Sequence, residues 1–220
     1  MRTLIKKIVS PLLKSASALY LAKRRKYSYK DLSVWVEPGV FPPFITFSTK
    51  ILLEFIEPLP LKDKRFLELG CGCGIISILA AKKGASVTAT DINETALKAL
   101  VKNAADNNVT LQITYSDLFG NLAGQSFDYI VINPPYYPKS PTTVAENAWF
   151  CGENFEYFAK LFEQLLKYIS ENCKVYMILS EDCAIEKIKS IVAENNLLFT
   201  LAVEHKSTFE KNFIFRISSL

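Results

Sequence analysis

The segment Glu68-Leu69-Gly70-Cys71-Gly72-Cys73-Gly74 decides the fold of this chain. It ends a short apolar run at residues 65–69, and a helical pattern of apolar residues begins directly after it, at Ile75. Glycines at a strand-to-helix turn let the backbone approach a ligand closely, and the start of the helix offers unpaired amide groups. A dinucleotide-binding turn would carry its third glycine at position 75, so Ile75 indicates a different ligand.

Strand and helix patterns alternate outward from this turn. We expect strands at 32–37, 65–69, 86–90, 111–115, 127–132, 174–179, 197–204 and 212–217, and helices at 51–56, 75–83, 94–107, 153–170 and 184–194. The alternation predicts an α/β fold with a seven-stranded, mostly parallel, doubly wound (Rossmann-like) sheet and helices on both faces. The last two strands leave no room for a crossover helix, so we expect them to form a C-terminal antiparallel pair.

Charge divides the chain unevenly. Of its 220 residues, 1–30 carry nine Lys or Arg and no acid, although the whole chain has a net charge of only +4. Apolar residues in this arm recur at helical spacing, at positions 4, 5, 8, 9, 12, 13, 16, 19 and 20. We predict three parts: a basic amphipathic N-terminal arm (1–30), a strand, Pro-rich loop and helix leading into the core (31–60), and the ligand-binding domain (61–220). The arm either contacts a polyanion, lies on a membrane surface or packs on the body.

Cysteine content and hydropathy exclude several classes of protein. The chain has five cysteines, an odd number that does not suggest a disulfide framework and fits a cytoplasmic protein. Cys71 and Cys73 lack the paired ligands of a zinc site, because the single histidine, His205, is far away in sequence. We therefore expect no metal. No apolar run reaches about 18 residues, so we expect no transmembrane segment.

Acidic residues near the glycine turn identify the expected ligand. Asp91 ends the next strand, where an acid in a doubly wound fold holds the hydroxyls of a ribose. Glu68 would repel a pyrophosphate but suits a cationic amine. A nucleoside that carries an amino acid satisfies both conditions, and S-adenosylmethionine is such a molecule. Asp117 and Leu118 follow the third strand at the same sheet edge, where they could contact an adenine.

A second turn, Asn133-Pro134-Pro135-Tyr136, ends the apolar strand at 127–132. Two prolines fix the backbone and remove its donors, so the carbonyls and the Asn133 side-chain oxygen remain as acceptors. Two acceptors suit the two N–H bonds of a planar NH2 group, and the Tyr136 ring could stack on that group. Positioning and desolvation would then be the main work of the site.

Together the two turns resemble the class I S-adenosylmethionine-dependent methyltransferases. The second turn resembles the amino-group N-methyltransferases, which include the release-factor glutamine methyltransferases (the HemK family) and the enzymes that methylate adenine or guanine amines in nucleic acids. The resemblance covers residues 34–220, and two further stretches, at 40–43 and 146–154, are most similar to the HemK group. It implies cofactor contacts for Glu68, Gly70, Gly72, Gly74, Asp91, Ile92, Asp117, Leu118, Phe41 and Pro43, and a grip on the acceptor nitrogen by Asn133, Pro134, Pro135 and Tyr136.

The resemblance implies a macromolecular acceptor, but two acceptors remain open. A protein glutamine, as in a release factor, is favoured by the segment at 146–154. An adenine or guanine amine of tRNA or rRNA is favoured by the basic arm, since the HemK enzymes carry a larger N-terminal domain in its place. A nicotinamide-dependent oxidoreductase and a non-catalytic S-adenosylmethionine-binding scaffold are the alternatives from other classes.

Overall fold

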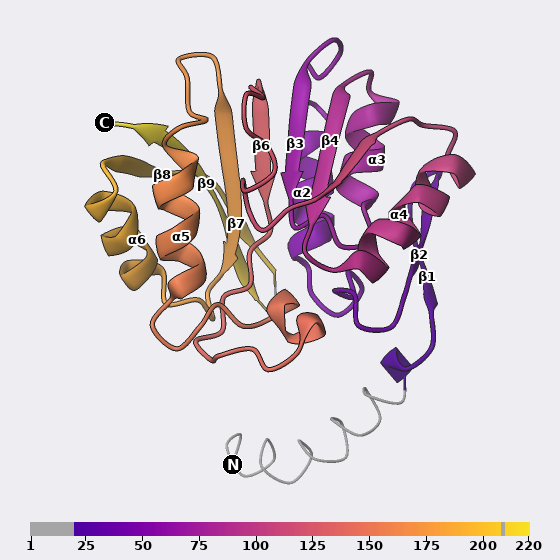
Figure 1. Ribbon diagram of the computed structural model, residues 1–220, viewed down its shortest axis with the longest axis horizontal. Helices are drawn as coiled ribbons and strands as arrows, with labels where there is room; N and C mark the ends of the chain where they lie inside the picture. Colours follow the sequence, from indigo (N-terminus) through magenta and orange to yellow (C-terminus); the bar gives the residue numbers. More distant parts are fainter. Residues whose placement is uncertain (1–19, 208–209) are drawn as a thin grey trace, which may run out of the picture.

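The computed structural model describes residues 20–207 and 210–220 (Figure 1). The expected helix of the basic arm lies outside the described residues except for its end, where Tyr20 and Leu21 are helical. The strands are β1 (Arg25–Tyr29), β2 (Leu32–Val36), β3 (Arg65–Leu69), β4 (Ser86–Asp91), β5 (Gln112–Tyr115), β6 (Tyr129–Ile132), β7 (Lys174–Ser180), β8 (Leu197–Lys206) and β9 (Lys211–Ser219). The helices are α2 (Ser48–Ile56), α3 (Ile75–Lys82), α4 (Glu94–Asp106), α5 (Glu156–Leu165) and α6 (Ile185–Glu194), with a 3-10 helix η1 (Val144–Ala148).

Seven strands form one sheet in the order β5-β4-β3-β6-β7-β9-β8, which confirms the predicted fold class. Strands β3 to β7 pair in parallel, whereas β9 pairs antiparallel with both β7 and β8. The C-terminal strand pair is therefore antiparallel as predicted, and its second member is inserted next to β7.

The register of the central strands places the two motifs side by side. Leu69 at the end of β3 is in register with Thr90 of β4 on one side and with Ile132 of β6 on the other. The glycine turn, Asp91 and Asn133 therefore emerge at the same edge of the sheet. Strands β4 and β5 are added on one side of β3, and β6 and β7 on the other, so the strand order changes direction at β3. Doubly wound folds bind their ligands at such a switch point.

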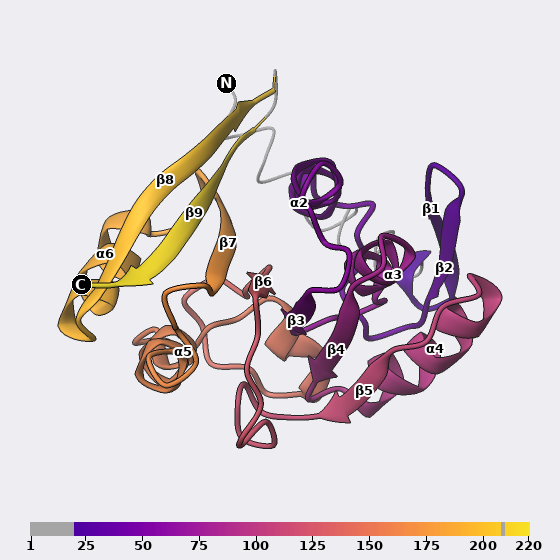
Figure 2. The ribbon, with the colours of Figure 1, turned by 90° about the horizontal axis from the view of Figure 1, so that it is seen from above.

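Helices cover both faces of the sheet, as Figure 2 shows from above, with α2, α3 and α4 on one face and α5 and α6 on the other. Side chains along each buried strand alternate between the two layers. Phe66 packs in the core on the α2–α4 side, and the next residue, Leu67, packs in the core on the α5–α6 side. The sheet is thus buried on both faces and holds the strand ends in fixed positions.

The β1–β2 hairpin is attached to helix α4 by asparagine side chains. Asn103 accepts from the Trp35 amide at 2.8 Å and donates to the Trp35 carbonyl at 2.9 Å. Asn107 accepts from the Ser33 amide at 3.2 Å and donates to the Ser33 carbonyl at 2.7 Å. Residues 33 and 35 on the strand are about as far apart along its axis as residues 103 and 107 are along the helix. The two side-chain amides can therefore bond to the free edge of β2 as the backbone of a third strand would. Strand β1 was not predicted, because its residues were assigned to the basic arm.

Helix α5 is shorter than the predicted helix at 153–170. Its N-cap, Phe155, has a left-handed backbone with φ +63°, which ends any helix that would extend further back. At the other end, Tyr168 donates to the Leu165 carbonyl at 2.9 Å, an i to i−3 bond that tightens the last turn. Periodicity alone cannot place such ends. Within residues 20–207 and 210–220, no helix is both long and apolar enough to cross a membrane.

Candidate functional site

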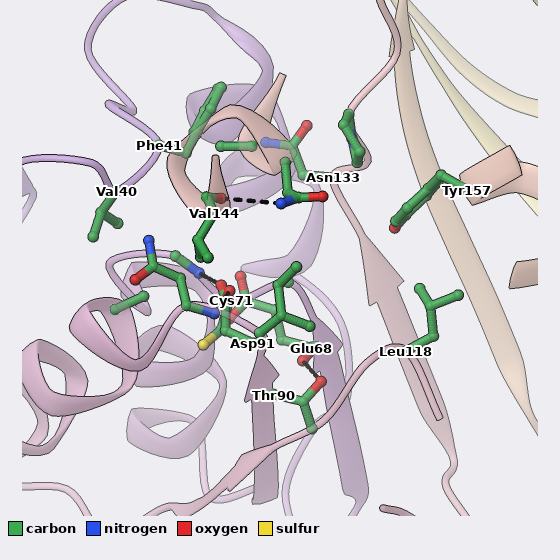
Figure 3. Close-up of a pocket in the computed structure, with 18 of the residues that line it drawn as sticks. Val40, Phe41, Glu68, Cys71, Thr90, Asp91, Leu118, Asn133, Val144 and Tyr157 are labelled. Atoms are coloured by element: carbon green, nitrogen blue, oxygen red, sulfur yellow. Dashed lines mark hydrogen bonds between the residues drawn. The ribbon is translucent and has the colours of Figure 1, made fainter. Parts of the chain in front are cut away.

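A cavity of about 330 Å³ lies at the carboxyl ends of β3, β4 and β6. Figure 3 looks into it, with Val40 and Phe41 on one side, Tyr157 on the opposite side, and Glu68 and Asp91 between them. Eleven of the fourteen predicted site residues line this cavity: Phe41, Pro43, Glu68, Gly70, Gly72, Asp91, Ile92, Asp117, Leu118, Asn133 and Pro135. Gly74 belongs to the same turn but does not line the cavity. Its size is in the range of sites for small organic ligands.

The three glycines of the turn have different roles. Gly70, Gly72 and Gly74 all have left-handed backbones, with φ of +69°, +51° and +75°. A Cβ on Gly70 would meet nothing within 4 Å, so this position leaves space at the cavity wall. A Cβ on Gly74 would lie 2.1 Å from the Leu100 Cδ1 of α4. Gly74 does not line the cavity, and packing against α4 is what requires a glycine there.

Asp91 is held by backbone amides from two segments. Its Oδ2 accepts from the Gly72 amide at 2.9 Å and its Oδ1 accepts from the Asn93 amide at 2.8 Å. Burial raises the pKa of Asp91, and the amide hydrogen bonds from Asn93 and Gly72 oppose that rise. A carboxylate has about four lone-pair sites, so each oxygen can still accept a bond from a ligand.

Glu68 is the most deeply buried carboxyl group of the site, with 5% of the residue exposed. Its Oε2 accepts from the Ser77 amide at 2.8 Å and from the Ser77 hydroxyl. Burial raises the pKa of Glu68 to about 8, against the lowering effect of both Ser77 bonds. A cationic ligand group would stabilise its charged form.

The predicted adenine contacts are accompanied by residues of α5 that sequence reasoning missed. The Asp117 carboxylate forms an ion pair with the Lys160 ammonium, and both residues line the cavity. Leu118 has a left-handed backbone, φ +51°, and its carbonyl accepts from the Ser116 hydroxyl at 2.7 Å. Tyr157, one turn before Lys160, also lines the cavity. Residues 157 and 160 are three apart in a predicted helix and therefore share one face, and this spacing is the sequence signal that could have indicated their place in the site.

Only two of the four residues of the Asn-Pro-Pro-Tyr turn line the cavity. Asn133 and Pro135 line the cavity, whereas Pro134 and Tyr136 do not. The Asn133 Nδ2 donates to the Ser48 Oγ of α2 at 3.3 Å, which orients the side-chain amide. Tyr136 is 8% exposed and packs in the core on the α5–α6 side, with its ring 4.8 Å from that of Tyr137. Its position under the turn differs from the predicted stacking on an acceptor.

The Pro-rich loop, residues 40–44, closes one side of the cavity. Val40 lies over the glycine turn, where a Cβ on Gly72 would be 3.8 Å from its Cγ1. The Phe41 ring packs 5.0 Å from the Trp149 ring, between centroids. The Asn93 Nδ2 donates to the Gly39 carbonyl at 2.9 Å, so the N-cap of α4 connects this loop to Asp91. These residues fix the loop over the expected cofactor.

The two cysteines of the glycine turn are buried and have thiols that are not activated. Cys71 and Cys73 are buried free thiols, and burial raises the pKa of both, that of Cys73 to about 12. Thiols of this kind are poor nucleophiles at neutral pH. No group of three or more His, Cys, Asp or Glu side chains with metal-binding geometry occurs in the described part of the chain.

Comparisons with known proteins find similarity to methyltransferases. Residues 31–151 match the family model described as the methyltransferase small domain. A protein of Methanocaldococcus jannaschii named "Putative protein N5-glutamine methyltransferase" is 49% identical over 112 residues, covering 50% of this chain and 54% of that protein. The ribosomal RNA small subunit methyltransferase C of Haemophilus influenzae is 35% identical over 111 residues, covering 49% and 33%.

A solved structure extends the likeness to most of the fold. The ribosomal protein L11 methylase of Lactobacillus delbrueckii subsp. bulgaricus has a TM-score of 0.59 and 26% identity, covering 84% of this chain and 83% of that one. The chain matches about half the length of the first curated relative above and a third of the second.

Proposed function

This chain belongs to the methyltransferase small domain family, and we propose that it transfers a methyl group from S-adenosylmethionine to a planar NH2 nitrogen, with a protein glutamine side chain as the first candidate. One observation carries the proposal. Asp91, the glycine turn and Asn133 line a single cavity because β4, β3 and β6 are neighbours in register. A site for a ribose-containing ligand therefore adjoins a site of hydrogen-bond acceptors.

The residues present fit S-adenosylmethionine. Asp91 keeps lone pairs on both oxygens for two ribose hydroxyls, although the Gly72 and Asn93 amides already bond to it. The buried Glu68 carboxyl favours the cationic amino group of the methionine part. Gly70 leaves the cavity wall open where a side chain would intrude. Leu118 supplies an apolar surface for the adenine. When bound, the cofactor supplies an electrophilic methyl group.

Further residues complete this assignment. Asp117 accepts a hydrogen bond from the adenine amine, which requires that its ion pair with Lys160 opens or shares the carboxylate. Phe41 and Pro43 exclude water from one side of the cavity, and Ile92 lies next to Asp91. We assign cofactor binding to residues 61–220, with the strand, Pro-rich loop and helix of residues 31–60 closing one side of the site.

Asn133 prepares the acceptor nitrogen. Its Nδ2 donates to Ser48, so the side-chain oxygen is the free end of the amide and can accept one N–H bond of the acceptor. Pro134 and Pro135 have no N–H, so this stretch of backbone offers only carbonyl acceptors for the second N–H bond. Two such bonds localise the nitrogen lone pair, which would otherwise be delocalised into the amide, and direct it toward the methyl group. Tyr136 supports the turn from the core beneath it.

The methylated nitrogen then loses a proton that its new positive charge has made acidic. No strong base is needed before the transfer, and the contribution of the chain is orientation and exclusion of water. Such positioning is worth several orders of magnitude in rate. Asn133 therefore acts on turnover, whereas Asp91 acts on cofactor affinity.

The choice of a glutamine acceptor is supported by the higher identity to the relative named as an N5-glutamine methyltransferase, 49% against 35% for the rRNA methyltransferase. An exocyclic amine of an RNA base is the second candidate. It is favoured by the basic residues at 23–26, of which Lys23 and Arg25 line a hollow together with the Pro-rich loop.

Incubation with methyl-labelled S-adenosylmethionine and a cell lysate freed of small molecules tests the proposal. Complete digestion of the labelled fraction with peptidases should release N5-methylglutamine, whereas acid hydrolysis should release the label as methylamine. Treatment with protease should remove the label from the macromolecular fraction, while RNase should not. The Asn133→Ala variant is the matched control and should leave both the protein and the RNA of the lysate unlabelled. Label on lysine or arginine would contradict a planar-amide acceptor, and RNase-sensitive label on a base amine would select the second candidate.

A further inference from the structure

Segment 20–24 and strand β1 place a cluster of cations on the surface. Lys23, Arg24 and Lys26 are exposed, and Arg25 is partly exposed. Within residues 20–207 and 210–220, none of these four side chains has a carboxylate oxygen within 4.0 Å, whereas Lys30 nearby pairs with Glu57. The positive charge of the cluster is therefore not neutralised by ion pairing.

Aromatic rings hold two of these cations in fixed positions. The Arg24 guanidinium lies 4.3 Å from the centroid of the Trp35 ring, and that of Arg25 lies 3.8 Å from the Tyr20 ring. Arg25 Nε also donates to the Tyr20 carbonyl at 3.0 Å. A guanidinium is planar, and stacking on a ring fixes the orientation of its N–H groups, which suits bonds to phosphate oxygens. Tyr20 is 48% exposed although its ring also contacts the Phe44 ring, 5.8 Å away between centroids, and its exposed part offers an aromatic surface to a base.

Two cations of this cluster, Lys23 and Arg25, lie next to the wall of the candidate site. A second, smaller hollow is lined by Lys23, Arg25 and Trp149, and also by Val40 of the Pro-rich loop. Val40 lines the main cavity as well, and Trp149 packs on Phe41, another of its lining residues. A chain bound along the cluster would thus lie next to the cavity.

We propose that this basic-aromatic surface, formed by Tyr20, Lys23, Arg24, Arg25, Lys26 and Trp35, binds the phosphate backbone of single-stranded RNA beside the cavity. Unpaired cations alternate here with aromatic rings, which is the pattern that contacts phosphates and bases together. An acidic peptide would use the charges but not the rings. The inference rests on the proposed function in one respect, because the surface borders the cavity assigned to methyl transfer. It applies equally to an acceptor on an RNA base and to an acceptor on a protein that is bound to RNA.

Fluorescence anisotropy with the full chain and a fluorescein-labelled 12-nucleotide uridine RNA, without cofactor, tests this inference. Affinity should fall between 50 and 200 mM salt, with a log–log slope of about 0.7 for each phosphate contact. The double variant Arg24→Ala/Lys26→Ala removes two exposed cations that make no hydrogen bonds to the fold. It should lower the slope by about 1.4 and weaken binding.

The matched control is Lys167→Ala/Lys187→Ala, which removes two exposed cations. Lys167 follows α5 and Lys187 lies on α6, and these helices cover the face of the sheet away from α2, α3 and α4. This control should bind the RNA as the unmodified chain does. An unchanged slope in Arg24→Ala/Lys26→Ala would overturn the proposal. So would equal affinity for a polyglutamate of matched charge, or tighter binding to phosphatidylserine vesicles than to RNA. The double variant should keep its affinity for S-adenosylmethionine, so a failure here is distinct from a failure of the proposed methyl transfer.

Discussion

Replacement of Asn103 by leucine should detach the β1–β2 hairpin from helix α4. The Asn103 side chain is 1% exposed and makes three hydrogen bonds, two with the Trp35 backbone and one to the Cys73 carbonyl at 3.1 Å. Leucine has nearly the same volume but can make none of these bonds. The variant therefore leaves one amide and two carbonyls without their partners, and it creates no large cavity.

The size of the effect follows from those three groups. A buried backbone group without a partner costs about 1–3 kcal/mol. Trp35 is only partly buried, so water can reach its backbone, and we use about 1 kcal/mol for each group. The free energy of unfolding should therefore fall by about 3 kcal/mol. In a chain of this length, that corresponds to a drop in melting temperature of roughly 6–12 °C.

Urea denaturation followed by circular dichroism measures this change. Lys98→Leu on the exposed face of the same helix is the control, and it should change stability by less than about 0.5 kcal/mol because its ion pair with Glu94 is on the surface. The Asn103→Leu variant should also bind S-adenosylmethionine more weakly, since Cys73 belongs to the glycine turn. A loss below about 1 kcal/mol together with unchanged affinity would refute the role given to these amides.

Two further predictions concern the glycine turn and its carboxyl group. Gly74→Ala should cost about 2–4 kcal/mol in urea denaturation, from backbone strain at φ +75° and overpacking against Leu100. Gly124→Ala, at φ +76° with nothing within 4 Å of its Cβ, isolates the strain, and equal losses in both variants would argue against the clash. Glu68 has a folded-state pKa of about 8, above its ordinary 4.5, so the folded protein holds the proton more tightly and this group lowers stability as pH rises from 4.5 to 8. The melting temperature of Glu68→Gln should thus exceed that of the unmodified chain increasingly between pH 5 and 8, and a constant difference would contradict the raised pKa.

Most of the fold, and the meeting of the glycine turn with Asp91 at one cavity, could be predicted from local patterns. The glycine turn and Asp91 each follow a buried strand, and parallel neighbours bring such positions together at one edge. Helix α5 shows why the rest could not be predicted. Its periodicity indicates which residues are buried, but not that Lys160 meets Asp117, 43 residues earlier in the chain.

Two other differences have similar causes. Tyr136 follows two prolines, and which side of the turn its ring takes depends on the space left in the core beneath β6. Strand β1 has a basic, polar sequence that resembles the arm before it. It is a strand because β2 pairs with it along the edge that α4 does not cover.

Calorimetric titration of S-adenosylmethionine into the purified chain and two variants tests the central claim most directly. The claim is that Asp91 and Asn133 serve two halves of one cavity. We predict one binding site per chain, with affinity lost in Asp91→Ala and kept within about threefold in Asn133→Ala, because that residue faces the acceptor. No binding by the unmodified chain, or equal losses in the two variants, would contradict the account.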